Sequence, residues 1–174
     1  MNLELKILFD RVSTDRLKLL QEVALLSNEK FTSCPQAGKW SISEILTHVL
    51  TSEKLSLGYM LKKSNRINEL NDSGPWESLK MMLLKMSQRL PLKFKAPKVV
   101  VDHTPEALSK GALTNAWHQH LNELQTFLET IEDKNIRKKI YKHPFAGRLD
   151  ARQALQFFQE HFHHHLPQVR KLLS

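Results

Sequence analysis

Two histidines near the end of the chain, His161 and His165, have the spacing of a pair of metal ligands. The segment 152–173 reads RQALQFFQEHFHHHLPQVRKLL, and residues four apart on a helix share a face. On a wheel of about 100° per residue, both histidines lie at the edge of the stripe formed by Phe158 and Phe162, so we expect them to point inward. Buried imidazoles need partners for their nitrogens, and a divalent metal ion is one such partner. The alternative is a pair hydrogen-bonded to buried carboxylates or water.

A third histidine, His48, lies on an earlier segment with helical periodicity. Ser41 and Glu44 have capping-box spacing and mark the start of that helix. His48 shares a face with Ile45, so it is also expected to point into the core. One histidine from an early helix and two from the last helix would leave a divalent ion with at least one open position, as catalytic sites do. Zinc and nickel both fit three nitrogens.

An ion held in this way can lower the pKa of a bound water to about 7 or activate a thiolate, and either role usually needs a proton acceptor nearby. Glu44 lies one turn before His48, so it is a candidate to orient that ligand or to accept a proton. An equally good interpretation makes Glu44 only the capping-box partner of Ser41. Glu53 and Glu160 point away on the wheel, so the sequence shows no convincing general base.

Other residues that could do chemistry favour structural interpretations. His118 and His120 are two residues apart and do not share a face, so we expect surface or interhelix polar roles. His143 is expected to shape a turn. Trp40 is expected to be a packing anchor at the start of its helix, and Cys34 an unreactive loop thiol.

Four long helices must position the candidate ligands. Apolar residues recur at spacings of three and four over about 3–26, 42–65, 104–131 and 152–173. Thr104 and Asp150 are expected to cap the third and fourth of these helices. A shorter helix is expected over 76–89, followed by an extended connector over 92–103. The pattern predicts an all-α four-helix bundle with one long crossover connection and a short extra helix, in a single domain of residues 1–174.

The composition excludes several functional classes. Hydrophobic residues make up 41% of the 174 and charged residues 25%, which is typical of an ordinary soluble globular protein. The single cysteine rules out an internal disulfide framework, and no apolar run approaches the ~20 residues that span a membrane. The N-terminus lacks a signal-peptide core, so we expect a cytoplasmic protein with no membrane partner. The net charge of +8 is dispersed and no nucleic-acid-binding motif accompanies it, so nucleic acid is not an expected partner.

Several stretches, in this order along the chain, resemble the DinB-like (DinB/YfiT) family of metal-binding four-helix bundles. They are Trp40-x7-His48, Phe94–Pro97 as a connector, His143–Gly147 as a turn, and His161-x3-His165-x2-Gln168. The resemblance covers most of the chain and implies a metal centre with Gln168 beside its ligands. Pro167 departs from the pattern, because it removes a backbone donor just before Gln168 and predicts a kink past the site.

The resemblance implies more than one function. Some relatives resemble transferases or isomerases that use a low-molecular-weight thiol, others are regarded as metal-dependent hydrolases, and many have a metal pocket without a demonstrated reaction. We predict a metal-dependent hydrolase or thiol-dependent S-transferase acting on a small molecule, with zinc or nickel bound by His48, His161 and His165. The competing hypothesis is a non-catalytic metal- or ligand-binding bundle in a stress response. The candidate partners are a small-molecule substrate or thiol and, in a homodimer, a second copy of the chain.

Overall fold

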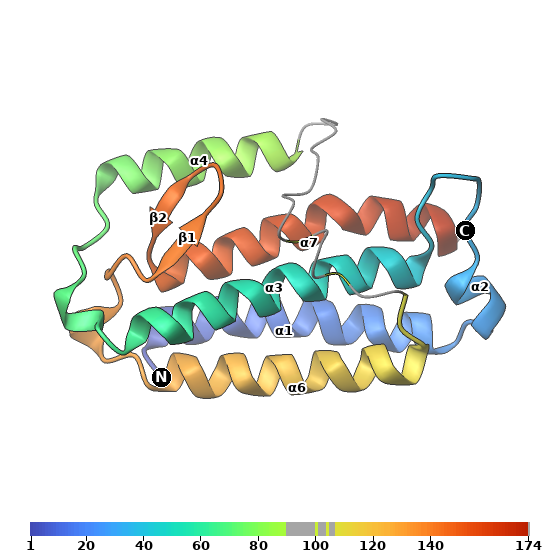
Figure 1. The fold of residues 1–174 in the computed structure, drawn as a ribbon, viewed down its shortest axis with the longest axis horizontal. Coiled ribbons are helices and arrows are strands. Elements are labelled where there is room, and N and C mark those ends of the chain that lie inside the picture. Colours follow the sequence, from blue (N-terminus) through green and yellow to red (C-terminus); the bar gives the residue numbers. More distant parts are fainter. Residues whose placement is uncertain (90–99, 101–103, 105–106, 174) are drawn as a thin grey trace.

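The protein is a bundle of four long helices, as predicted. The computed structural model describes residues 1–89, 100, 104 and 107–173, and the predicted connector over 92–103, including Phe94–Pro97, lies outside the described residues except at Val100. The long helices lie side by side (Figure 1) and are α1 (Leu3–Ala24), α3 (Ile42–Ser64), α6 (Lys110–Glu129) and α7 (Ala151–Leu173). None of the described helices has the length and uninterrupted apolar character that crossing a bilayer requires.

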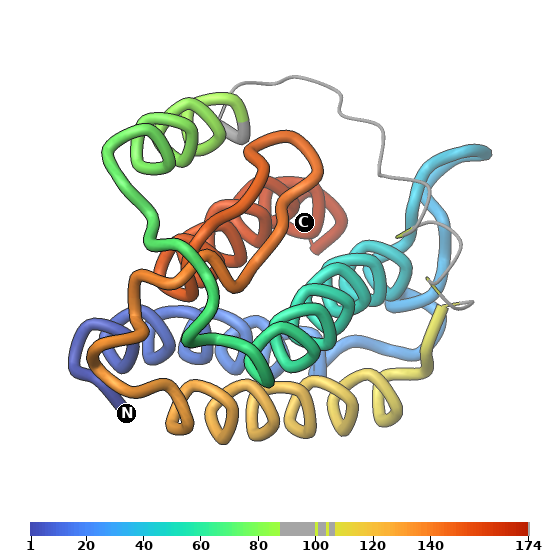
Figure 2. Tube along the Cα trace, turned by 60° about the vertical axis from the view of Figure 1, so that its left-hand side comes forward, coloured from blue at the N-terminus to red at the C-terminus, as the bar shows by residue number. Residues whose placement is uncertain are grey.

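The long crossover connection joins α3 to α6 and carries the predicted extra helix, α4 (Pro75–Arg89). This helix packs on α7 at the outside of the bundle (Figure 2). The same crossover contains the 3-10 turn η1 (Ile67–Glu69), before α4. Two more short helical elements among the described residues are α2 (Asn28–Thr32), between α1 and α3, and the 3-10 turn η2 (Asp133–Asn135), after α6.

The start of the third long helix was predicted wrongly. It begins at Lys110, and its cap is Ser109, whose hydroxyl accepts a hydrogen bond from the Ala112 N–H at 3.3 Å. Thr104 does not cap it, because the Thr104 hydroxyl donates to the Val100 carbonyl at 2.7 Å. The other predicted cap is confirmed: the Asp150 carboxylate accepts from the Gln153 N–H at 2.9 Å.

A small hairpin precedes α7, where only a turn was predicted. Its strands are β1 (Tyr141–His143) and β2 (Gly147–Leu149), paired antiparallel with Tyr141 opposite Leu149. His143 shapes the turn as predicted, since its Nδ1 accepts hydrogen bonds from the N–H groups of Phe145 and Ala146 at 3.2 and 3.1 Å. Three-residue strands are too short to give a periodic signal, and this is why the pairing was missed.

The apolar core consists of two clusters, one toward each end of the bundle. One contains Leu5, Leu57 and Phe158, and the other contains Leu19, Val49 and Phe162. Along each long helix, the residues of the first cluster and those of the second occupy different halves. The three histidines of interest lie on the halves of α3 and α7 that contribute to the second cluster.

Candidate metal centre

The structure brings His48, His161 and His165 together. Each offers one ligand nitrogen, and these three atoms lie within 4.8 Å of one another. The ring centroids of His161 and His165 are 4.8 Å apart, and that of His48 is 5.5 and 5.1 Å from theirs. Nitrogens bound to one tetrahedral zinc ion are about 3.4 Å apart, so the three side chains are close to the spacing of a single ion site.

The start of α3 fixes the position of His48. The Ser41 hydroxyl accepts from the Glu44 N–H at 3.1 Å, and the Glu44 carboxylate accepts from the Ser41 N–H at 2.7 Å. This capping box sets where the helix begins and therefore which face of the helix carries His48. His48 is turned into the core, with 6% of its surface exposed.

Burial keeps all three imidazoles neutral. Loss of hydration lowers the pKa of His48 to about 4 and, with repulsion from His48 and His164 added, that of His165 to about 3. Desolvation followed by repulsion from His165 holds the pKa of His161 well below its usual value. Neutral imidazoles carry the free lone pair that a metal needs.

An unsatisfied nitrogen of His161 is consistent with a metal ion at these residues. Nδ1 of His161 is buried and has no hydrogen-bond partner among the described residues. A buried polar atom without a partner costs about 1–3 kcal/mol. A divalent ion bound by the histidine nitrogens is one partner that would remove this cost at His161.

Gln168 supports His165, although Pro167 precedes it. The Gln168 side-chain oxygen lies 3.4 Å from Nδ1 of His165, so this nitrogen donates and Nε2 keeps the free lone pair. The helix α7 continues through Pro167 as far as Leu173. The proline therefore does not end the helix before Gln168 reaches its neighbour.

Glu44 acts at the helix cap and not on a histidine. Its carboxylate accepts from Ser41 and from the Cys34 thiol, whose Sγ lies 3.3 Å away. This hydrogen bond raises the pKa of Cys34, so the thiol stays protonated and poorly nucleophilic at neutral pH. Among the described residues, no carboxylate hydrogen-bonds to His48, His161 or His165.

Trp40, expected to be a packing anchor, is partly exposed and packs on a histidine. It is 44% exposed, and its ring centroid lies 5.0 Å from that of His48. Phe157 stacks on His161 with ring centroids 5.4 Å apart. Aromatic side chains therefore contact two of the three histidines.

A buried polar network in the middle of the bundle was not predicted. Arg16 and Glu53 form an ion pair, with 1% and 0% of their surfaces exposed, and Nε2 of His120 lies 3.3 Å from the Glu53 carboxylate. Arg16 also donates to the carbonyls of Val12 and Phe158 at 2.8 and 2.9 Å. The network thus connects α1, α3, α6 and α7, and it gives His120 the interhelix role that was one of its two expected roles.

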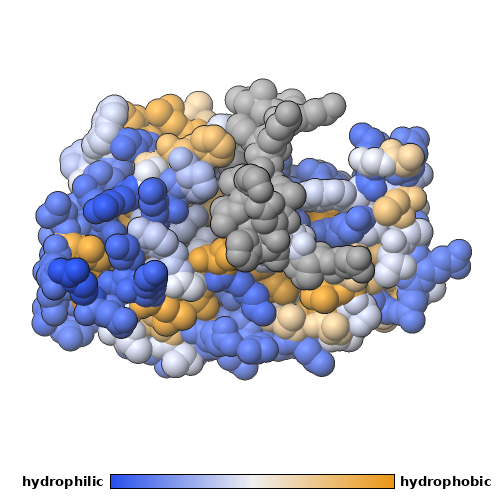
Figure 3. All heavy atoms as spheres, viewed as in Figure 1, coloured by the Kyte–Doolittle hydropathy of each residue, from blue (hydrophilic) through white to orange (hydrophobic). Residues whose placement is uncertain are grey.

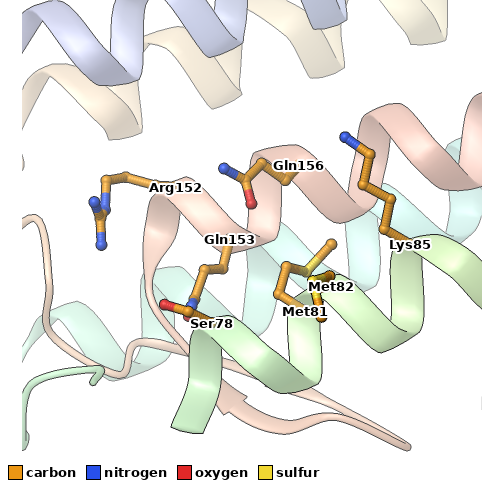
Figure 4. A pocket seen from close by; sticks show the side chains of 7 residues that line it. All are labelled: Ser78, Met81, Met82, Lys85, Arg152, Gln153 and Gln156. Atoms are coloured by element: carbon orange, nitrogen blue, oxygen red, sulfur yellow. The ribbon is translucent and has the colours of Figure 1, made fainter. Parts of the chain in front are cut away.

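A separate hollow of about 290 Å³ lies between α4 and α7 (Figure 4), toward the opposite end of α7 from the histidines. Its lining residues are Ser78, Met81, Met82, Lys85, Arg152, Gln153 and Gln156. Both cations already have partners: Lys85 pairs with Glu160 at 3.1 Å, and Arg152 pairs with Asp150 at 2.7 Å. Because its charges are already paired, we assign no ligand to this hollow.

The metal-free protein is expected to lose stability as the pH falls below 6.5. The folded-state pKa values of His48 and His165, about 4 and about 3, lie below the value near 6.5 of an unfolded histidine. The unfolded chain therefore binds more protons in this range, and acid favours it. Going from pH 7.5 to 5.0 should lower the free energy of unfolding by about 2 kcal/mol for each of these histidines.

Urea unfolding with a chelator present measures this dependence. Burial lowers the pKa of His143 to about 4, so His143 should contribute a similar loss of unfolding free energy. His48→Gln should remove the contribution of one histidine. Equal stability at pH 7.5 and 5.0 would contradict the burial of these groups as neutral imidazoles.

Comparison with known proteins gives two similarities. The model of the DinB superfamily matches residues 11–169, a range that contains all three histidines. The chain is also similar to a protein of Bacillus subtilis (strain 168) described as uncharacterized protein YuaE. The two are 23% identical over 157 residues, which cover 90% of this chain and 91% of YuaE. No solved structure matches.

Proposed function

Since the chain belongs to the DinB superfamily, we propose that His48, His161 and His165 bind one divalent metal ion at a centre that acts on a small molecule. The observation that carries the proposal is the meeting of three neutral imidazoles within 4.8 Å, one of them with a buried nitrogen that lacks a partner among the described residues. Three nitrogen donors suit zinc or nickel, and they leave at least one coordination position open.

The protein residues have distinct roles in this proposal. Burial keeps the imidazoles unprotonated, and Gln168 holds His165 in the tautomer with a free Nε2. Trp40 and Phe157 border the centre with apolar surface. When bound, the ion would supply Lewis acidity that acidifies a water or a thiol in the open position.

Of the two reactions predicted for this family, the thiol-dependent transfer is better supported than the hydrolysis. Activation of a water usually needs a general base, and no described carboxylate hydrogen-bonds to the histidines. A small thiol has a pKa of about 8.5 and ionises far more easily than water. We therefore propose a thiol-dependent S-transferase first and a hydrolase second. A homodimer stays a sequence-based prediction.

Cobalt(II) in place of the native ion provides the test, because its visible spectrum reports the ligands. Adding free cysteine to the cobalt-loaded protein should produce a sulfur-to-cobalt charge-transfer band, and adding serine, its oxygen analogue, should not. Cobalt that binds without a cysteine-dependent band would contradict the thiol reaction and favour the hydrolase or the non-catalytic bundle. Failure of cobalt to bind would contradict the metal centre itself.

A further inference from the structure

The outward face of α4 is apolar from Trp76 to Met86. Residues spaced by three and four, from Trp76 to Met86, share this face, while Met81 and Leu84 face the protein and are buried. Several exposed large apolar side chains on one helix face commonly mark a surface that binds a partner or a membrane. The exposed fractions run from 39% to 62% for Trp76, Leu79, Met82, Leu83 and Met86.

The hairpin adds to this face. The turn between β1 and β2 lies beside α4 in both views (Figures 1 and 2), and Phe145 in that turn is 73% exposed. Figure 3 shows hydrophobic side chains gathered over α4. We call Phe145 and the five exposed residues of α4 the α4 surface.

Three cations lie on α4 and on the hairpin beside it. Lys80 lies over the Trp76 ring, with Nζ 5.5 Å from its centroid. Lys142 and Arg148 are exposed and directly opposite each other in the hairpin, where like charges repel. None of the three forms an ion pair with another described residue.

The acidic residue of α4 does not offset these charges. Glu77 is turned away from the outer face, with 12% of its side chain exposed, and it pairs with Lys139 at 2.9 Å. The α4 surface is therefore apolar, with Lys80 on it and two more cations on the neighbouring hairpin. Its partner should be apolar and negatively charged.

We propose that the α4 surface binds an anionic lipid surface. Trp76 and Phe145 would lie at headgroup depth, and Lys80, Lys142 and Arg148 would meet the anionic headgroups. A second copy related by a two-fold axis would bring the same cations together and is disfavoured. A helical peptide partner needs a groove, whereas α4 forms an outer ridge (Figure 2).

This proposal revises the sequence-based prediction of no membrane partner. That prediction considered segments long enough to span a bilayer, and α4 has 15 residues. A helix that lies in the interface has no such length requirement. The proposal is independent of the metal centre, because no residue of the α4 surface belongs to it.

Sedimentation of the full chain with extruded vesicles tests the proposal. Binding to vesicles of equal parts phosphatidylcholine and phosphatidylglycerol should exceed binding to phosphatidylcholine alone at least tenfold, since each of the three cations adds attraction. The excess should fall as salt is raised to about 150 mM. Leu83→Glu should reduce binding to the anionic vesicles at least tenfold, and it changes a side chain that is 55% exposed.

Matched variants separate this surface from general stickiness. Leu25→Glu alters a leucine that is 89% exposed at the end of α1, and it should leave binding unchanged. The double change Lys142→Gln and Arg148→Gln should weaken binding, whereas Arg11→Gln with Lys18→Gln on α1 should not. Absence of binding to anionic vesicles at low salt, or binding that Leu83→Glu leaves intact, would overturn the proposal. A third result would also overturn it: a wild-type chain that binds no vesicles and forms a dimer that Leu83→Glu dissociates. The α4 surface would then be the contact between two copies of the chain.

Discussion

Replacing Glu53 with alanine is expected to lower the free energy of unfolding by about 3–5 kcal/mol. The Glu53 carboxylate is fully buried and accepts hydrogen bonds from Nε and Nη2 of Arg16, while Nε2 of His120 lies 3.3 Å away. Its removal leaves the Arg16 guanidinium, which is 1% exposed, as an uncompensated buried charge. Urea unfolding at pH 7.5 gives the difference directly.

Two controls define what this result means. Glu22→Ala breaks the pair between Glu22 and Arg170, whose side chains are 31% and 46% exposed, and should cost less than about 1 kcal/mol. Combining Arg16→Met with Glu53→Leu should recover much of the lost stability, because no ion then remains unpaired. If Glu53→Ala costs no more than Glu22→Ala, the buried ion pair does not stabilise the bundle in the way proposed.

Replacing His161 with alanine is expected to weaken zinc binding more than 100-fold. Changing a residue that only orients a ligand already costs 10–100-fold in metal affinity, and this change removes a ligand itself. His161 also carries the buried nitrogen that has no other partner among the described residues. Competition with a chromophoric chelator at pH 7.5 measures the affinity.

His163→Ala is the matched control for this prediction. His163 is on the same helix but faces solvent, where its Nε2 lies 2.8 Å from the Asp15 carboxylate. Zinc affinity should be unchanged in this variant. Equal losses in the two variants would mean that zinc binds to the run of surface histidines and not to the buried centre.

The helices and the three histidines could be predicted because their signals are local. Helical periodicity over twenty residues identifies a face, and the helical wheel alone places His48, His161 and His165 on faces that turn inward. The spacing of Ser41 and Glu44 located the start of α3, and both hydrogen bonds of that capping box are present. Local patterns of this kind need no knowledge of which helices are neighbours.

The buried network could not be predicted, because it depends on pairing across helices. Arg16, Glu53 and His120 come from three helices, and each one alone is typical of a polar surface position. Their burial becomes favourable only when the three meet. The exposure of Trp40 and the α4 surface escaped prediction for a related reason, since the sequence does not show which apolar residues lack a neighbour.

The start of α6 was missed for a more local reason. Thr104 and Ser109 are both good capping residues, and Pro105 favoured the earlier one. The Thr104 hydroxyl is used by the turn before it, whereas the Ser109 hydroxyl is available to cap α6. Both hydrogen bonds are local, and the capping preferences of the two residues do not by themselves decide which one starts the helix.

Metal analysis of the untagged chain, purified without an immobilised-metal column, tests the central claim most directly. The three-histidine centre predicts about one zinc or nickel ion per chain, and its loss in His48→Ala, His161→Ala and His165→Ala. Wild-type protein that holds no metal, even after zinc or nickel is added at neutral pH, would contradict the claim. The three histidines would then be structural residues of the bundle.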